Sequence, residues 1–301
     1  MRYRAFGLFN QNVSSIGVSL ANPDMKLRHK RDLLIAGLEA GINLYEVDSS
    51  DFQAAEPLGQ AVDSLERAQF LFGLRVRAYS RLASAATVLD LVQEVTEQAN
   101  LEFIDYLMLE LPARGAVSAD LLKGATAAKS RGMVRFIGMT GQGPEAERLL
   151  KSNSVQVASE SFNLASPWSQ RNYVRDLSAK GLALIGEDYF PALARDAPAV
   201  RAEEEAGQRG NWLARLAEKV VPGPATLHPA YRFLYEVPDW TAEELCLASA
   251  LNEPAISCFL TSPDDAATLN RLAAVVDREI PAYIPAQIEM ARIEYLKSAG
   301  L

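Results

Sequence analysis

Histidine, cysteine and long apolar segments are scarce in this chain of 301 residues. His29 and His228 are the two histidines, which nearly excludes a histidine-based metal site or a Ser-His-Asp triad. The two cysteines, Cys246 and Cys258, lie in a helical pattern and an apolar run, as is typical of buried, reduced thiols. A functional site must therefore be sought among other residue types.

The sequence also lacks the features of membrane, secreted and nucleic-acid-binding proteins. No apolar run is long enough to cross a bilayer, and no N-terminal stretch combines the basic, apolar and cleavage regions of a signal peptide. The formal net charge is −8 and the basic residues are scattered, which argues against a surface for nucleic acid. We expect a cytoplasmic protein with no nucleic-acid and no membrane partner.

The chain does contain a regular alternation of short apolar runs and amphipathic helices. The expected strands are residues 16–20, 42–45, 69–76, 104–111, 134–140, 155–159, 182–186 and 255–260. A hairpin around residues 10–12 precedes them, and the regularity lapses over 188–240, where several prolines and an acidic run occur. We predict a single domain over 1–301. It is an α/β chain forming a (β/α)8 barrel with an N-terminal β-hairpin and an insertion or lid at about 188–240, and a doubly wound open sheet is the alternative.

Three acidic residues follow the second expected strand, in the stretch GINLYEVDSSDFQAAEPLG from Gly41 to Gly59. Gly41 is a typical left-handed helix cap, and the apolar run after it leads to Glu46, Asp48 and Asp51. Charged groups at the end of a buried strand are unfavourable unless they are solvated or paired. In repeated βα units that end is also where active sites lie. We interpret the cluster as part of a site, with a solvated loop as the alternative.

Several motifs together resemble the aldo-keto reductases. They are MRYRAFGLFNQNVSSIGVSL, GINLYE followed by EPLG, DYLMLELP, GMVRFIGMTG and the FNL of residues 162–164, in the order and spacing of that family. The resemblance covers residues 1–178 and resumes over 248–272. It implies the barrel fold and NADP(H)-dependent carbonyl reduction by a tetrad of Asp, Tyr, Lys and His.

The positions that the resemblance assigns to this tetrad contain other residues here. Glu46 stands in place of the family's Asp, and Asp51 in place of the proton-donating Tyr. Arg75 stands in place of the Lys, and Glu110 in place of the His. The chain is therefore expected to be a divergent member whose catalytic tetrad is replaced.

The resemblance also assigns a cofactor side to the barrel. Thr140 stands for the Ser that holds the carboxamide, Ser159 stands where Gln is usual, and Tyr189 is the candidate ring that stacks on nicotinamide. The segment LTSPDDAATLN has no Lys or Arg where family members hold the 2′-phosphate, and Asp264 and Asp265 there would repel an anion. We predict no cofactor, and NADP(H) bound by those three residues is the alternative.

Carboxylates gather at the expected strand ends, with Arg75 as the clearest cation among them: Glu46, Asp51, Glu110, Glu160, Glu187 and Asp188. A guanidinium can neutralise one carboxylate while the pKa of a second one rises, which gives an acid and a base in one pocket. We therefore assign Glu46, Asp51, Arg75 and Glu110 as catalytic candidates for elimination, isomerisation or hydrolysis. The alternatives are a purely structural salt bridge of Arg75 and a divalent metal on Glu46, Glu110 and Glu160. We assign no metal site.

Three functions compete for this sequence. We favour a repurposed enzyme that performs carboxylate acid–base chemistry on a small metabolite, cationic or polar, without nicotinamide. The second is a divergent NADPH-dependent oxidoreductase of carbonyl or C=C groups. A Glu at the position of Glu110 resembles the steroid 5β-reductases of that family, but these keep the Tyr that Asp51 replaces. The third is a non-catalytic binding protein whose site has decayed.

Overall fold

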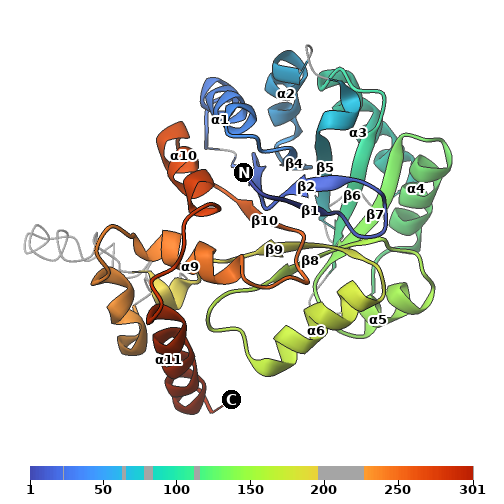
Figure 1. Cartoon of the computed structure of the whole chain (residues 1–301). Helices are drawn as coiled ribbons and strands as arrows, with labels where there is room; N and C mark the ends of the chain where they lie inside the picture. Colours follow the sequence, from blue (N-terminus) through green and yellow to red (C-terminus); the bar gives the residue numbers. More distant parts are fainter. Residues whose placement is uncertain (23, 63–65, 78–83, 112–115, 196–226, 301) are drawn as a thin grey trace, which may run out of the picture.

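The computed structural model describes residues 1–22, 24–62, 66–77, 84–111, 116–195 and 227–300. Eight parallel strands close into a barrel in the order β10-β3-β4-β5-β6-β7-β8-β9 (Figure 1). Their bounds are β3 Ile16–Ser19, β4 Leu44–Asp48, β5 Leu71–Arg77, β6 Ile104–Glu110, β7 Val134–Thr140, β8 Val157–Ser161, β9 Ala183–Glu187 and β10 Cys258–Thr261. The prediction of a (β/α)8 barrel is confirmed, and the open-sheet alternative is wrong.

Helices surround the barrel (Figure 1). The α-helices are α1 Leu27–Glu39, α2 Ala55–Val62, α3 Ala85–Gln98, α4 Ala119–Ser130, α5 Pro144–Lys151, α6 Trp168–Ala179, α9 Ala242–Ala250, α10 Ala266–Val275 and α11 Ile284–Ser298. The short 3₁₀ helices are η1 Phe52–Ala54, η2 Arg67–Gln69, η3 Ala192–Ala194 and η4 Pro229–Tyr235. Gly41 ends α1 at φ +80°, as its left-handed cap position predicted. Among the described helices, none is long and apolar enough to cross a bilayer.

The predicted N-terminal hairpin is present and closes the N-terminal end of the barrel. Strands β1 (Tyr3–Ala5) and β2 (Asn12–Ser14) pair antiparallel. Phe6 between them is fully buried and packs on Tyr106 inside the barrel, with ring centroids 6.3 Å apart. The Arg4 guanidinium donates to the carbonyl of Ile256, just before β10, at 2.6 Å. With this end covered, the cavity at the strand ends lies at the opposite, C-terminal end.

The barrel interior leaves space for one large polar side chain. Tyr106 on β6 lies beside Gly73 on β5, where a Cβ atom would be 2.1 Å from the Tyr106 ring. The glycine therefore lets the tyrosine extend toward the C-terminal end of the barrel. Cys258 contributes to the same apolar interior, and Cys246 packs elsewhere; both are buried free thiols, as predicted.

The expected insertion at 188–240 is described in part. Residues 196–226 lie outside the described residues. On either side of them, η3 and η4 form a second apolar cluster with α9 and α11, centred on Tyr231, Leu234, Leu245 and Ile284. This cluster extends the wall of the barrel mouth on the side of β9.

Candidate active site

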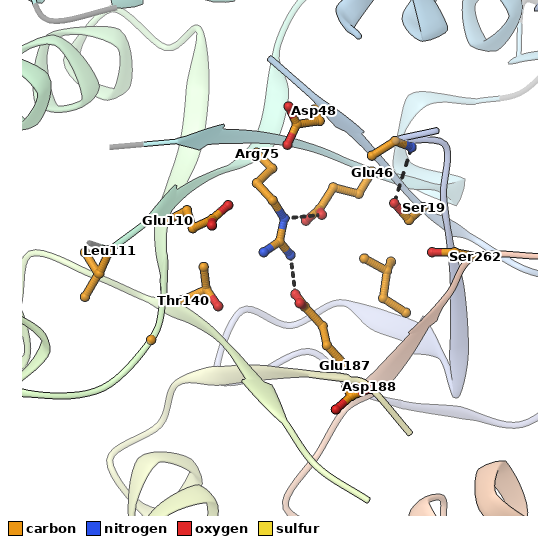
Figure 2. Close-up of a pocket in the computed structure, with 13 residues that line it drawn as sticks. Ser19, Glu46, Asp48, Arg75, Glu110, Leu111, Thr140, Glu187, Asp188 and Ser262 are labelled. Carbon is orange, nitrogen blue, oxygen red and sulfur yellow. Dashed lines mark hydrogen bonds and ion pairs between the residues drawn. The ribbon is translucent and has the colours of Figure 1, made fainter. Parts of the chain in front are cut away.

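A cavity of about 560 Å³ opens at the C-terminal end of the strands (Figure 2). Its charged lining residues are Glu46, Asp48, Arg75, Glu110, Glu187 and Asp188. Among the lining residues that the structure describes, five are carboxylic acids and Arg75 is the single cation. The mouth of the barrel is therefore acidic, as the carboxylates at the expected strand ends predicted.

Arg75 lies between two of these carboxylates, which come from opposite sides of the barrel (Figure 2). Its Nε donates to Oε1 of Glu46 on β4 at 2.7 Å, and its Nη2 donates to Oε1 of Glu187 at the end of β9. Burial lowers the pKa of Arg75, but its contacts with Glu46 and Glu187 outweigh burial and raise that pKa above its ordinary value. Arg75 is thus a permanent cation in the mouth.

Two hydroxyl groups complete this arrangement. The Tyr106 hydroxyl donates to Oε2 of Glu46 at 3.1 Å, and burial raises the pKa of Tyr106, so it stays a donor. The Ser159 hydroxyl donates to Oε1 of Glu187. We refer to Arg75, Glu46, Glu187, Tyr106 and Ser159 as the Arg75 network. The network contains one guanidinium and two carboxyl groups, so its charges do not balance when both carboxyls are ionised.

Glu46 is the most buried acid of the network. Its side chain is 1% exposed, compared with 12% for Arg75 and 29% for Glu187. Burial raises the pKa of the Glu46 carboxyl, an effect that Arg75 opposes and that the nearby Glu187 carboxylate reinforces. A buried acid of this kind, held by a fixed cation and a fixed hydroxyl donor, is suited to exchanging a proton with a bound molecule.

The structure brings three of the four predicted catalytic residues to this cavity. Glu46, Arg75 and Glu110 line it, whereas Asp51 does not. The Asp51 carboxylate forms an ion pair with Lys30 of α1, whose side chain is 1% exposed. A buried ammonium needs a nearby counter-charge, so Lys30 holds Asp51 at the start of η1. Asp51 therefore lies outside the lining of this cavity, and its catalytic role stays a prediction.

Of the three residues predicted to hold nicotinamide, Thr140 alone lines this cavity. Thr140 is not part of the Arg75 network. Ser159 is fully buried and donates to Glu187. Tyr189 is buried, and its hydroxyl donates to Glu243 of α9 at 2.8 Å. Tyr189 does not line the cavity, so its position does not match the stacking role that the resemblance implies.

The N-terminus of α10, where the resemblance places a phosphate, already holds a carboxylate. Asp265 Oδ1 accepts a hydrogen bond from the Thr268 amide at 2.7 Å, and this bond lowers the pKa of Asp265. Arg271, in the same helix, donates to the Thr268 hydroxyl at 3.2 Å. An ionised side chain at the helix end competes with any phosphate for the same amide. The described residues therefore do not fit the 2′-phosphate of NADP(H).

The alternative metal site is not assembled either. Glu160 is absent from the lining of the first cavity, which separates it from Glu46 and Glu110. Across the described part of the chain, no three acidic, histidine or cysteine side chains converge to hold a metal ion.

A second cavity of about 820 Å³ adjoins the first and shares Thr140, Gly141, Glu187 and Asp188 with it. Its wall includes Glu160 of β8, residues at the start of α6, and the C-terminal part of α11. Asp188 adopts φ +53°, an uncommon conformation for a residue other than glycine, and burial raises its pKa. The two cavities together form one elongated mouth.

Sequence reasoning left several of these residues without a role. Glu187, Asp188 and Glu160 were expected near the rim but not among the catalytic candidates, and Tyr106 was read only as part of a strand. The signal for Tyr106 was available, because a tyrosine inside the run IDYLMLE needs space and a hydrogen-bond partner. No local pattern indicates that Glu187 contacts Arg75, since the two are 112 residues apart in the chain.

The fold is that of the aldo-keto reductases. The structure is similar to aldo-keto reductase AKR11C1 from Bacillus halodurans in its holo form, with a TM-score of 0.73 and 14% identity over 97% of this chain and 96% of that chain. It is also similar to the thermostable aldo-keto reductase Tm1743 in complex with the inhibitor epalrestat, with a TM-score of 0.69 and 12% identity over 97% and 99%. No protein-family model matches the sequence, and no curated protein is significantly similar to it.

Proposed function

We propose that this chain is an enzyme that catalyses proton transfer on a small cationic or polar metabolite, without nicotinamide, at the mouth of the barrel. The observation that supports this most is the Arg75 network, in which one guanidinium is shared by two carboxyl groups inside an acidic cavity. Two carboxyls that share one cation have different proton affinities, which provides an acid and a base at one place.

In this proposal Glu46 accepts a proton from the bound molecule and returns it to another atom of that molecule or to its product. Arg75 and the Tyr106 hydroxyl hold the Glu46 carboxyl in a fixed orientation. Glu187 fixes the far side of the guanidinium and, being 29% exposed, is accessible to ligand. Elimination and isomerisation need only these groups, and hydrolysis needs a water molecule from the solvent in addition.

The preference for a cationic molecule comes from the charge of the mouth. Five carboxylic acids and one cation line the first cavity among the residues described, and Arg75 is already bonded to two of those acids. Such a cavity attracts positive ligands and repels the phosphates of a dinucleotide. This charge and the carboxylate at the start of α10 favour nicotinamide-independent chemistry.

An NADPH-dependent oxidoreductase is the second candidate, and the likeness to solved aldo-keto reductases favours it. Thr140 is compatible with it by position. The contacts of Ser159 and Tyr189 with Glu187 and Glu243 speak against it. A non-catalytic binding protein is the third candidate, in which the Arg75 network only stabilises the barrel.

A screen for solvent exchange tests the proposal. Small cationic and neutral metabolites that raise the Tm of the protein are incubated with it in D2O, and deuterium uptake is followed by NMR. We expect a cationic molecule to acquire deuterium with the wild type and not with Glu46→Gln. The matched control is Glu147→Gln, because Glu147 is 67% exposed on α5 and pairs only with Lys151 among the described residues.

Two outcomes would contradict the proposal. Exchange that continues at the wild-type rate in Glu46→Gln would remove Glu46 from the chemistry. Ligands that bind in the mouth but show neither exchange nor conversion to product would indicate a binding protein.

A further inference from the structure

Glu160 is a buried acid that the Arg75 network does not use. It lies on β8, lines the second cavity and is 5% exposed. Its Oε2 atom accepts hydrogen bonds from Nε2 of Gln142 at 2.9 Å and from Nε2 of Gln170 at 3.2 Å. Its Oε1 atom is buried and has no hydrogen-bond partner among the described residues. Half of this carboxyl group is therefore unsatisfied by the residues that the structure describes.

Several other buried acids in this fold have a cation beside them. The fully buried Asp105 pairs with Arg67 at 2.5 Å, and Glu253 pairs with Arg175 at 2.9 Å. For Glu160 the structure gives two neutral amides instead. A buried acceptor without a donor, and a buried acid without a counter-charge, are both unfavourable unless a ligand or a proton supplies what is missing.

The surroundings of Glu160 favour a ligand with positive charge. No Lys, Arg or His is among the described residues that line the second cavity, whereas Glu187 and Asp188 do line it. Among the residues that the structure describes, the titratable groups that face Glu160 are Glu187 on β9 and Tyr173 on α6, and neither is a cation. Burial raises the pKa of Glu160 and the Glu187 carboxylate reinforces this effect, whereas the amides of Gln142 and Gln170 oppose it.

We propose that the second cavity binds a guanidinium or primary ammonium group of the ligand, with Glu160 as the anion that receives it. Such a group supplies both the N–H donor that Oε1 lacks and the missing counter-charge. Hydroxyl groups of Ser161, Ser166 and Ser169 in the same wall accept its remaining hydrogen bonds.

The two cavities share Glu187 and Asp188, so one elongated molecule can occupy both. Its cationic end lies at Glu160, and its reacting end then lies at the Arg75 network. The placement of the reacting end rests on the proposed function, whereas the binding of the cation at Glu160 does not. The substrate class that follows is a small molecule with a cationic nitrogen at one end and the reacting group at the other.

Calorimetry with a matched pair of probes tests the binding. N-butylguanidinium and N-butylurea have nearly the same shape, but only the first is charged. We expect the full-length protein to bind N-butylguanidinium and to bind N-butylurea at least about tenfold more weakly, because a neutral group gives Glu160 no counter-charge. Equal binding of the two probes, or no binding of N-butylguanidinium at millimolar concentration, overturns the proposal.

Variants then locate the site. Glu160→Gln should weaken N-butylguanidinium binding by about tenfold or more, whereas the surface control Glu147→Gln should not change it. Ser169→Lys is a second test that leaves Glu160 and its amide partners intact. Ser169 is exposed and lines the cavity, so a lysine there places a competing cation in the wall and should also weaken binding. Unchanged binding in both Glu160→Gln and Ser169→Lys overturns the proposal.

One further variant separates this inference from the proposed function. Glu46 lies in the first cavity, so Glu46→Gln should leave the affinity for N-butylguanidinium within about twofold of the wild-type value. Loss of exchange in Glu46→Gln with retained probe binding supports both proposals. Retained exchange in Glu46→Gln with lost probe binding in Glu160→Gln removes the proposed chemistry and leaves the cation site standing.

Discussion

At the scale of single residues, the site depends on buried charges that hold one another in place. Arg75 is bonded to Glu46 and Glu187, and Lys30 to Asp51, in each case with little exposure of the cation. A buried pair adds little net stability over an apolar pair, but removal of one partner leaves an uncompensated charge. These pairs therefore fix geometry, and each single substitution has a large effect.

Arg75→Met should lower the free energy of unfolding by about 3–5 kcal/mol, because it leaves the buried Glu46 without its cation. Arg75→Lys should lower the free energy of unfolding by less, because lysine keeps the positive charge. It should still lower it, because lysine has no planar guanidinium with which to bridge two carboxylates. Urea unfolding at neutral pH measures both values. A loss below about 1 kcal/mol for Arg75→Met would mean that the contacts of Arg75 are those of an exposed pair.

Glu160 should make stability fall as the pH rises. Burial raises its pKa in the folded protein above the ordinary value of 4.5, so between 4.5 and the raised pKa the unfolded chain loses a proton that the folded chain keeps. Stability from this group is complete below the ordinary value and lost as the pH passes the raised one. Glu187 and Tyr173, which face Glu160, are present in wild type and variant alike, so their contribution largely cancels in the comparison.

The measurement is the free energy of unfolding of the wild type minus that of Glu160→Gln across this pH range. The difference should decrease with pH by no more than about 1.4 kcal/mol per pH unit. The corresponding difference in the free energy of unfolding for Glu147→Gln should not change with pH. A difference that increases with pH would show that Glu160 is stabilised as an anion in the folded protein.

The sequence was least informative about the contacts of single residues. Glu46, Arg75 and Glu110 were chosen because each lies near the C-terminal end of a strand and at a position that the resemblance assigns to the family's tetrad. The ion pair of Asp51 with Lys30 was not predicted, because Lys30 lies on an otherwise ordinary amphipathic helix and no pattern indicates that its side chain turns inward. A contact between two side chains that are distant in the chain produces no periodic pattern in the sequence, so sequence patterns do not predict it.

At the scale of elements, strand register decides which groups meet. Strands β4 and β5 pair so that Glu46 lies opposite Gly73 and Asp48 opposite Arg75. Strand β6 then places Tyr106 opposite Gly73, so the glycine leaves space for the tyrosine that donates to Glu46. The strands themselves were predictable from apolar runs separated by amphipathic helices, whereas register was not, because nothing local determines which residues face each other.

Gly73→Ala should disrupt this arrangement without changing charge. Its Cβ would lie 2.1 Å from the Tyr106 ring, so the ring must move and its hydrogen bond to Glu46 must lengthen or break. We expect a loss of about 1–3 kcal/mol in the free energy of unfolding, the range for an overfilled core. Near-ultraviolet circular dichroism should change as well, because the environment of Tyr106 changes.

The double variant Gly73→Ala with Tyr106→Leu is the control for this prediction. It removes the clash, so it should regain part of the stability relative to Gly73→Ala with Tyr106 present. An unchanged stability and spectrum for Gly73→Ala alone would mean that Tyr106 does not need the space beside Gly73.

At the scale of the whole molecule, the fold can stay the same while the residues of the site change. The chain shares its fold over nearly its full length with aldo-keto reductases at 12–14% identity. Barrels of this kind place their chemistry on the ends of the strands, so the residues there can change while the apolar layers persist. The barrel was predictable because its periodicity extends along the whole chain, whereas the reaction depends on a few residues at the rim.

The measurement that tests the central claim most directly is a titration of the full-length protein with NADPH at low ionic strength, followed by tryptophan fluorescence and calorimetry. The acidic mouth and the Asp265 carboxylate at the start of α10 predict no binding at micromolar concentrations of NADPH. Low salt maximises electrostatic effects of either sign, so a second titration at moderate salt shows whether repulsion is responsible. Micromolar binding under either condition would contradict nicotinamide-independent chemistry and favour the oxidoreductase.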